Sequence, residues 1–297
     1  MPHTVTRRTA MSAIAGAAAG SLVADAQTAL PAYVPYAAAD EGPLKGNLKQ
    51  SACRWCYSKM SLDDLCQAAA KIGLKAIDLL DENEWAVPGK YGLVCAMCNG
   101  PGGITVGWNQ QKEHDKLTQE AERRLPLISE AKLPNMIVFS GNRRGMDDKE
   151  GIKNCAKGLK RIMPLAEKLN VTVCMELLNS KHDHKDYQCD HTDWGAAVAD
   201  EIGSPRFKLL YDIYHMQIME GDVIATITQY KDYIGHYHTG GVPGRHEIDE
   251  SQELNYRRIC EAVLANGYTG YLAQEFVPSK DKDPVASLTQ CARICDV

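Results

Sequence analysis

The chain has 297 residues, of which 44% are hydrophobic and 24% are charged, and this composition excludes disordered and collagen-like proteins. The length predicts one large domain or two small ones. The formal net charge of −5 and the pI of about 6.0 provide no basic field for nucleic acid or anionic lipid. We therefore expect no nucleic-acid partner.

The first 26 residues differ in composition from the rest of the chain. Thr6–Arg8 carries two arginines and precedes the apolar, small-residue stretch Met11–Val23, which Ala24–Ala26 follows. This pattern predicts a twin-arginine signal peptide over residues 1–26 and a periplasmic location in a bacterium. The apolar stretch is shorter than the roughly 20 strongly apolar residues of a membrane span, so we expect no stable membrane insertion. An uncleaved N-terminal anchor is the alternative.

A Pro- and Ala-rich linker is expected over residues 27–48, and a single α/β domain over residues 49–297. Within that domain, short apolar runs alternate with longer amphipathic segments, which indicates βα units and a parallel sheet. The candidate strands are residues 50–56, 75–80, 92–98, 135–140, 171–177, 207–212, 234–239 and 270–276. Eight such strands predict a (β/α)8 TIM barrel.

Capping and turn residues indicate which segments between these strands form helices and which form loops. Ser61 is placed to cap a helix that Gly73 would end. The segment 81–91 is short and contains a proline and a glycine, so its helix is expected to be absent or a single turn. Residues 99–110 contain four glycines and a proline and predict a long loop after the third strand.

The eleven cysteines all follow the expected signal peptide, and their odd number leaves at least one thiol unpaired within the chain. Two C-x-x-C pairs, Cys53/Cys56 and Cys95/Cys98, have the spacing of a zinc knuckle. The segment between the pairs is predicted to hold a helix and two strands. A segment of this size is too long for a zinc knuckle and favours buried thiols or disulfides.

Four polar residues occupy equivalent positions at the carboxyl ends of the last four candidate strands. They are Glu176, Asp212, His238 and Glu275, and their separations of 36, 26 and 37 residues each match about one βα unit. The carboxyl ends of barrel strands meet at one face, so we expect these side chains to converge. Three carboxylates placed together repel each other unless a cation is present. Carboxylate and imidazole ligands predict one divalent metal ion: Mn²⁺, Mg²⁺, Co²⁺ or Zn²⁺.

Five segments carry a family resemblance: Met175–Asn179, Tyr211–Gln217, Gly235–His238, Pro243–Glu247 and Gln274–Phe276. Together they resemble the hydroxypyruvate isomerase family, which belongs to the xylose isomerase-like TIM-barrel superfamily. That superfamily also contains ketose 3-epimerases and an endonuclease branch. The resemblance implies a single divalent ion bound by the same two glutamates, aspartate and histidine.

The implied reaction interconverts an α-hydroxy ketone and an α-hydroxy aldehyde through an enediolate. Glu176 and Glu275 are the expected acid and base. His215 is expected to bond a substrate oxygen or to orient a ligand carboxylate, and Arg245 to bind a substrate carboxylate or hydroxyl pair. His182 is a further substrate-binding candidate.

Arg54 and Trp108 are weaker candidates for the same pocket, since both follow or lie near the carboxyl end of a strand. An arginine on the surface is the alternative for Arg245, and a tryptophan in the core for Trp108.

The activity implied by the resemblance is the isomerisation of hydroxypyruvate to tartronate semialdehyde, with a small carbohydrate or keto acid as the partner molecule. His238 departs from the glutamine that hydroxypyruvate isomerases more often have, and matches the histidine of the epimerases. A ketose 3-epimerase, or a lyase or hydrolase of keto-sugars, is therefore the alternative enzyme. A non-catalytic sugar-binding barrel is the alternative outside enzymes. The sequence leaves a homo-oligomer open.

Overall fold

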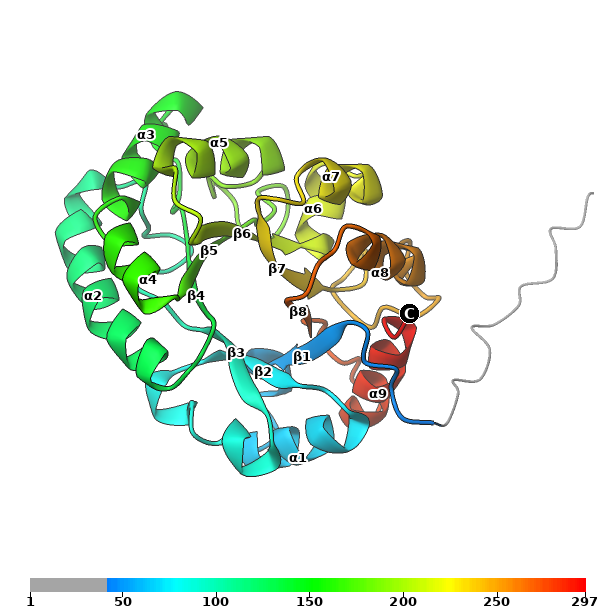
Figure 1. The fold of residues 1–297 in the computed structure, drawn as a ribbon. Helices are drawn as coiled ribbons and strands as arrows, with labels where there is room; N and C mark the ends of the chain where they lie inside the picture. Colours follow the sequence, from blue (N-terminus) through cyan, green and yellow to red (C-terminus); the bar gives the residue numbers. More distant parts are fainter. Residues whose placement is uncertain (1–41) are drawn as a thin grey trace, which may run out of the picture. The chain divides into compact units, whose positions relative to one another are not determined.

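The computed structural model describes residues 42–297, and its centre is a closed barrel of eight parallel strands in the order β1 to β8 (Figure 1). This architecture confirms the predicted (β/α)8 TIM barrel. The strands are β1 (Lys49–Cys53), β2 (Ala76–Leu80), β3 (Val94–Cys98), β4 (Asn135–Val138), β5 (Thr172–Glu176), β6 (Phe207–Asp212), β7 (Ile234–Thr239) and β8 (Tyr271–Gln274).

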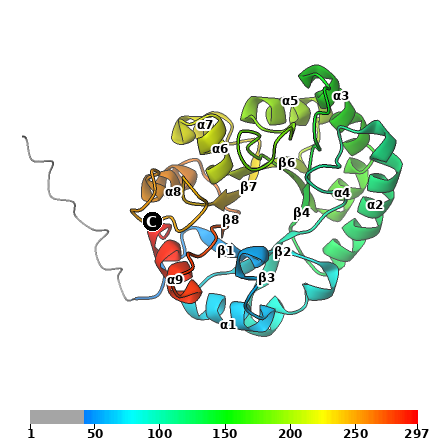
Figure 2. The same cartoon turned by 180° about the vertical axis from the view of Figure 1, so that it is seen from behind.

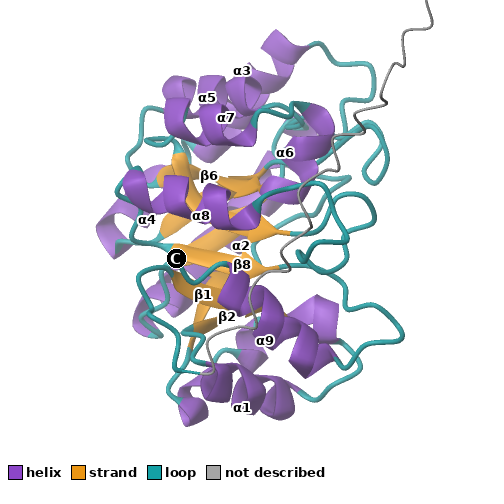
Figure 3. Ribbon diagram, turned by 90° about the vertical axis from the view of Figure 1, so that its right-hand side faces the viewer, coloured by secondary structure: helices purple, strands orange, loops and turns teal. Residues whose placement is uncertain are grey.

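Helices surround the barrel on its outside, as the view from behind and the side view show (Figures 2 and 3). The α-helices are α1 (Leu62–Ile72), α2 (His114–Glu130), α3 (Asp148–Leu159), α4 (Met163–Leu169), α5 (Thr192–Ile202), α6 (Ile213–Met219), α7 (Val223–Gln229), α8 (Tyr256–Ala265) and α9 (Pro284–Ile294). No helix in residues 42–297 is long and apolar enough to cross a membrane.

The local signals in the sequence predict several element ends correctly. The Ser61 side chain accepts a hydrogen bond from the Asp64 backbone N–H at 3.0 Å and caps α1. The same helix ends at Gly73, whose φ of 107° lies in the left-handed region that favours glycine. Only 3₁₀ turns, Glu82–Glu84 and Pro88–Tyr91, connect β2 to β3, which agrees with the expected lack of a full helix.

The described chain begins within the expected linker. Lys45 and Gly46 donate their backbone N–H groups to the Asp296 carboxylate at 2.7 and 3.1 Å, and the Leu48 side chain is buried. Residues 42–48 are therefore fixed to the C-terminal end of the domain. The predicted signal peptide and most of the linker lie outside the described residues.

Side chains from alternate positions of the strands fill the barrel interior. Asp78 of β2 bonds to His236 of β7 across the barrel, so both side chains point inward. An apolar cluster of Met97, Ile137, Cys174 and Leu210 adds to the interior beside this polar pair. The inner space is thus a packed core at this level, and the open cavity lies nearer the carboxyl ends of the strands.

The cysteines are free thiols, and ten of the eleven are buried. The Sγ atoms of Cys95 and Cys98 lie 3.8 Å apart, whereas Cys53 has its Sγ 3.8 Å from His238 Nε2. Among the described residues, no cluster of potential metal ligands combines cysteines from both C-x-x-C pairs. These side chains are therefore mostly buried thiols, which is one of the alternatives expected from the sequence.

Candidate functional site

The four predicted ligand residues converge at the carboxyl end of the barrel. Glu176 and Asp212 are the last residues of β5 and β6, His238 lies one residue before the end of β7, and Glu275 directly follows β8. One ligand atom from each residue lies within 4.8 Å of the other three, and all four residues are buried. The barrel therefore brings together side chains that span a hundred residues of sequence.

The His238 ring shows that this cluster suits a cation. Its Nδ1 atom lies 2.5 Å from Glu275 Oε2 and 3.5 Å from Glu176 Oε1, yet it has no partner in hydrogen-bond geometry. A buried nitrogen aimed at carboxylate oxygens without a hydrogen bond is the arrangement expected where the groups share a metal ion. Three carboxylates and one imidazole fit Mn²⁺, Mg²⁺, Co²⁺ or Zn²⁺.

A second set of polar groups holds the other side of that ring. His238 Nε2 faces Asp78 Oδ2 at 3.6 Å and Cys53 Sγ at 3.8 Å, and Asp78 Oδ2 also lies 2.5 Å from His236 Nε2. Burial acts to raise the pKa of Asp78, but His236 and His238 together outweigh it and hold the pKa at about 2. The ionised carboxylate therefore favours an N–H on Nε2 of His238, and Nδ1 is then the atom that would bind a metal ion.

Arg245 supplies positive charge directly beside the carboxylates. Its Nη2 donates to Asp212 Oδ2 at 2.7 Å and to Glu275 Oε2 at 2.6 Å, and its Nε donates to the Glu275 carbonyl at 3.2 Å. The side chain is only 13% exposed. The loop reaches this position through two residues with left-handed φ, Gly244 at 92° and Arg245 at 57°. Arg245 is therefore a buried part of the site, not a surface arginine.

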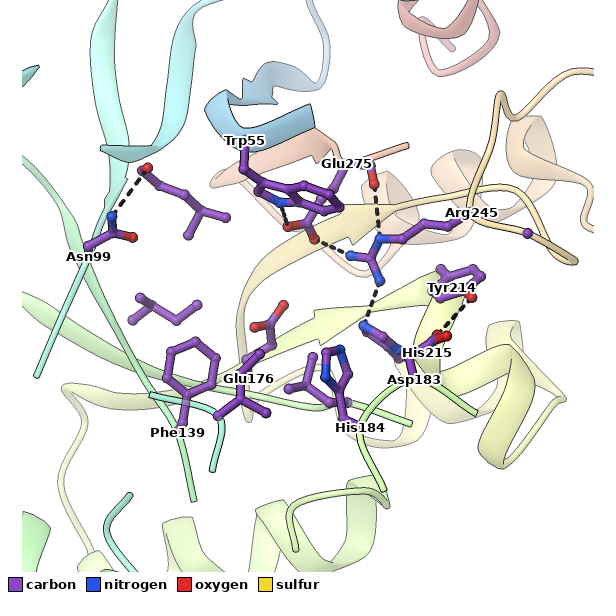
Figure 4. Close-up of a pocket in the computed structure, with 15 residues that line it drawn as sticks. Trp55, Asn99, Phe139, Glu176, Asp183, His184, Tyr214, His215, Arg245 and Glu275 are labelled. Atoms are coloured by element: carbon purple, nitrogen blue, oxygen red, sulfur yellow. Dashed lines mark hydrogen bonds and ion pairs between the residues drawn. The ribbon is translucent and has the colours of Figure 1, made fainter. Parts of the chain in front are cut away.

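Two aromatic rings enclose the guanidinium (Figure 4). Its Cζ lies 5.6 Å from the centre of the Trp55 ring and 4.8 Å from that of Tyr214. The indole Nε1 of Trp55 also donates to Glu275 Oε1 at 2.6 Å. Both Glu275 oxygens thus have a partner, which fixes the carboxylate in one orientation. Trp55 is 46% exposed, so it forms the outer edge of the site.

His215 joins the arginine to a network from the loop after β5. Its Nε2 lies 2.6 Å from Arg245 Nη1, and its Nδ1 lies 2.6 Å from the Asn179 amide nitrogen. Asn179 also donates to the Asp183 carboxylate at 2.7 Å, which accepts from the Tyr214 hydroxyl at 2.8 Å. Burial, and then the charge of Arg245, lower the pKa of His215 well below its usual value. The imidazole is neutral.

The remaining candidates lie elsewhere. His182 is exposed and donates only its backbone N–H, to Asn179 Oδ1 at 3.0 Å, whereas His184 lines the cavity. Trp108 is completely buried outside the cavity, and Arg54 donates to the Tyr57 carbonyl at 2.9 Å.

A cavity of about 600 Å³ opens beside the cluster and has two chemically different sides (Figure 4). Arg245, Tyr214 and Asp183 lie on the polar side. In Figure 4, Phe139 and Asn99 lie on the side away from Arg245 and Tyr214. The apolar part of the lining, called here the apolar wall, consists of Leu79, Ile104, Ile137, Phe139 and Leu178. Glu176 and Glu275 also line the cavity and can reach a molecule bound there.

The pKa values of the two glutamates are shifted in opposite directions. Burial raises the pKa of Glu176, and the nearby Glu275 carboxylate raises it further. Burial acts in the same direction on Glu275, but His238 and Arg245 outweigh it and hold that pKa well below the usual value. Of the two buried carboxyl groups, Glu176 therefore holds a proton more readily than Glu275.

Comparisons with known proteins agree with this architecture. A family profile described as "Xylose isomerase-like TIM barrel" matches residues 66–290. The 2-oxo-tetronate isomerase of Cupriavidus necator is 39% identical over 108 residues, which cover 36% of this chain and 41% of that protein. The hydroxypyruvate isomerase of Escherichia coli is 37% identical over 81 residues, which cover 27% and 31%. The match thus spans about two fifths or less of these relatives' own lengths.

Solved structures share the fold at low sequence identity. The 3-keto-D-glucoside 4-epimerase YcjR of E. coli superposes with a TM-score of 0.68 and 19% identity, covering 84% of this chain and all of that chain. A D-psicose 3-epimerase gives the same TM-score at 16% identity, with coverages of 84% and 96%. Because the family profile covers most of the barrel, including all four strand ends of the cluster, the chain belongs to the xylose isomerase-like TIM-barrel family.

Proposed function

We propose that this chain is a divalent-metal-dependent isomerase that moves a proton between neighbouring carbons of an α-hydroxycarbonyl compound. Hydroxypyruvate, converted to tartronate semialdehyde, is the reference substrate for this reaction. The observation that carries the proposal is the pair Glu176 and Glu275, which belong to one four-residue cluster, line one cavity and have pKa values shifted in opposite directions. The similarity to isomerases of 2-oxo-tetronate and hydroxypyruvate supports it.

The two glutamates provide the acid and the base that such a reaction needs. Glu275 favours its ionised form and is suited to accept the proton from the hydroxyl-bearing carbon. Glu176, whose pKa burial raises, holds a proton more readily than Glu275 and is suited to supply a proton to the neighbouring carbon. The reverse reaction uses the same two groups in exchanged roles. Trp55 and Arg245 hold Glu275 in place through hydrogen bonds of 2.6 Å each.

Glu176, Asp212, His238 and Glu275 would hold the metal ion. When bound, a divalent ion supplies positive charge that stabilises the negative charge on the substrate oxygens. Arg245 and the neutral His215 lie on the polar side of the cavity and would orient a substrate oxygen.

One observation favours a second candidate, a 3-epimerase with the same acid and base. The fourth proposed ligand is the imidazole of His238, the residue type that the family resemblance in the sequence associates with epimerases. An epimerase removes a proton from one face of a carbon and returns it to the other face, so it also needs two groups. The two reactions differ in their products and share the exchange of a carbon-bound proton.

Proton exchange with solvent therefore tests the proposal directly. The metal-loaded protein is incubated in D₂O with hydroxypyruvate, dihydroxyacetone and a ketohexose, and loss of C–H signal and product identity are followed by NMR. We expect exchange with at least one compound, and a fall of at least about 10²-fold in Glu176→Gln and Glu275→Gln at saturating metal. Substrate binding without exchange would contradict an enzyme and support a sugar-binding barrel.

A further inference from the structure

The cavity has little means of binding a substrate carboxylate. Among the described residues that line it, none is a lysine, and Arg245 is the one arginine. The guanidinium of Arg245 already bonds to two carboxylates, one carbonyl and one imidazole. Of the two histidines in the lining, His215 has its ring nitrogens in contact with Arg245 and Asn179, and burial lowers the pKa of His184. Apart from the proposed metal ion, a negatively charged substrate would meet no cationic side chain here that lacks partners among the described residues.

Carboxylates already occupy this part of the site. Glu176 and Glu275 line the cavity, and Asp212 bonds to Arg245 beside them. A bound substrate carboxylate would place a further like charge next to these buried groups, where like charges repel strongly.

The apolar part of the cavity lining indicates which kind of group a substrate carries in place of a carboxylate. Ile137 and Leu178 are buried in the wall, and Leu79, Ile104 and Phe139 are partly exposed to the cavity.

Asn99 is the one polar side chain on this side, and its amide nitrogen already contacts the Leu79 carbonyl at 3.4 Å and Asp81 at 3.0 Å. Figure 4 shows Phe139 and Asn99 on the side away from Arg245 and Tyr214. This surface favours an apolar group over hydroxyls or charges.

We propose that the preferred substrate is an uncharged hydroxyketone that carries an apolar substituent, and that short keto acids are poor substrates. The inference rests on the proposed isomerase function and narrows its substrate class. The hydroxyketone oxygens lie toward the metal ligands, and the substituent lies against the wall of Leu79, Ile104, Ile137, Phe139 and Leu178. A volume of about 600 Å³ leaves room for such a substituent, whereas a three-carbon acid would fill only a small part of it.

Two matched pairs of compounds separate charge from apolar contact, because each contains the same exchangeable HOCH₂–CO group. Hydroxypyruvate and dihydroxyacetone differ only in a carboxylate against a hydroxymethyl group. 1-Hydroxybutan-2-one and 1-hydroxy-4-phenylbutan-2-one differ only in the phenyl ring. With metal saturated, we expect kcat/KM for exchange in D₂O to favour dihydroxyacetone by at least about tenfold. The phenyl compound should exceed its parent by at least about tenfold.

A lysine on the apolar wall tests the location of the effect. Ile104→Lys places a cation inside the cavity and should reduce the preference for the phenyl compound while raising kcat/KM for hydroxypyruvate. Ile224→Lys is the matched control, since Ile224 lies on α7, is 40% exposed and does not line the cavity. The control adds the same charge to the protein and should leave both preferences unchanged.

The outcomes separate this inference from the reaction itself. Exchange that is equal for both members of each pair, or faster for hydroxypyruvate, would overturn the substrate class and leave the isomerase proposal standing. Equal effects of the two lysine substitutions would overturn the role of the apolar wall. If none of the four compounds exchanges above the rate of Glu176→Gln, the proposed function fails, and this inference fails with it.

Discussion

Arg245 is the positive charge that balances the buried carboxylates when no metal is bound, and replacing it with methionine tests this role. Its Nη2 donates to Asp212 and Glu275 at 2.7 and 2.6 Å, and both carboxylates are less than 5% exposed. Removing one partner of a buried ion pair costs about 3–5 kcal/mol. Burial, only partly offset by Arg245, already raises the pKa of Asp212 to about 7, so this carboxyl can take up a proton and limit the loss.

We therefore expect Arg245→Met to destabilise the metal-free protein by about 3 kcal/mol, at the lower end of that range. For a domain of this size, such a loss lowers the melting temperature by roughly 6–12 °C. Divalent metal should close most of the gap, because the ion supplies the missing positive charge. The variant should also bind Mn²⁺ at least about tenfold more tightly, since one repelling charge has been removed.

Thermal unfolding in EDTA and in saturating Mn²⁺, together with calorimetric titration of Mn²⁺, measures both effects. Arg54→Met is the matched control, because the Arg54 guanidinium donates to a backbone carbonyl and to none of the four ligand residues. A metal-free Arg245→Met protein as stable as the wild type would refute the reasoning. A stability gap that persists unchanged in saturating Mn²⁺ would refute the idea that arginine and metal balance the same carboxylates.

Further predictions follow from neighbouring contacts. Asp78→Asn should weaken Mn²⁺ binding by about 10–100-fold, because the carboxylate holds the His238 ring, whereas Asp190→Asn should leave Mn²⁺ affinity unchanged in the same titration. Trp55→Phe should lower kcat/KM by at least about tenfold through loss of an N–H bond to a ligand carboxylate, with an unchanged circular dichroism spectrum. Ser61→Ala should remove the cap of α1 and lower the melting temperature by about 2–4 °C without changing C–H exchange.

The convergence of the four candidate ligand residues could be predicted from the sequence because the barrel itself fixes it. Each βα unit returns the chain to the same face, so Glu176, Asp212 and Glu275 need only lie at strand ends to meet. His238 follows the same rule, although the last two positions of β7 are both polar. These predictions required strand ends accurate to about one residue and no knowledge of side-chain conformation.

The same reasoning did not predict that Asp78 points into the barrel, because β2 is irregular. Its pairing with β3 shifts register on both sides of Asp78, and Leu79 has a left-handed φ of 62°. Alternation along this strand therefore does not predict which side chains point into the barrel. An aspartate within the apolar run Ala76–Leu80 was the available signal, and its inward direction depends on the bulge.

Trp55 and Asp183 were missed for a different reason. Both lie in connections after strands, and their positions depend on loop conformations that no periodic pattern encodes. The Asp183 carboxylate accepts hydrogen bonds from Asn179, in the loop after β5, and from Tyr214, at the start of α6. His182 is exposed and lies outside the cavity lining, whereas His184, two positions further along the same loop, lines the cavity.

In the proposed function, the position of Arg245 links metal binding to substrate choice. Because its guanidinium balances two ligand carboxylates, it cannot also neutralise a substrate carboxylate without leaving those groups unpaired. A barrel with these strand-end residues would therefore need an additional cation elsewhere to accept a keto acid. The positions that could carry this additional cation lie on the apolar wall. Ile104 belongs to the loop after β3, and Phe139 follows β4. Substrate class would then change through these loop and strand-end positions, while the metal ligands on the barrel stay the same.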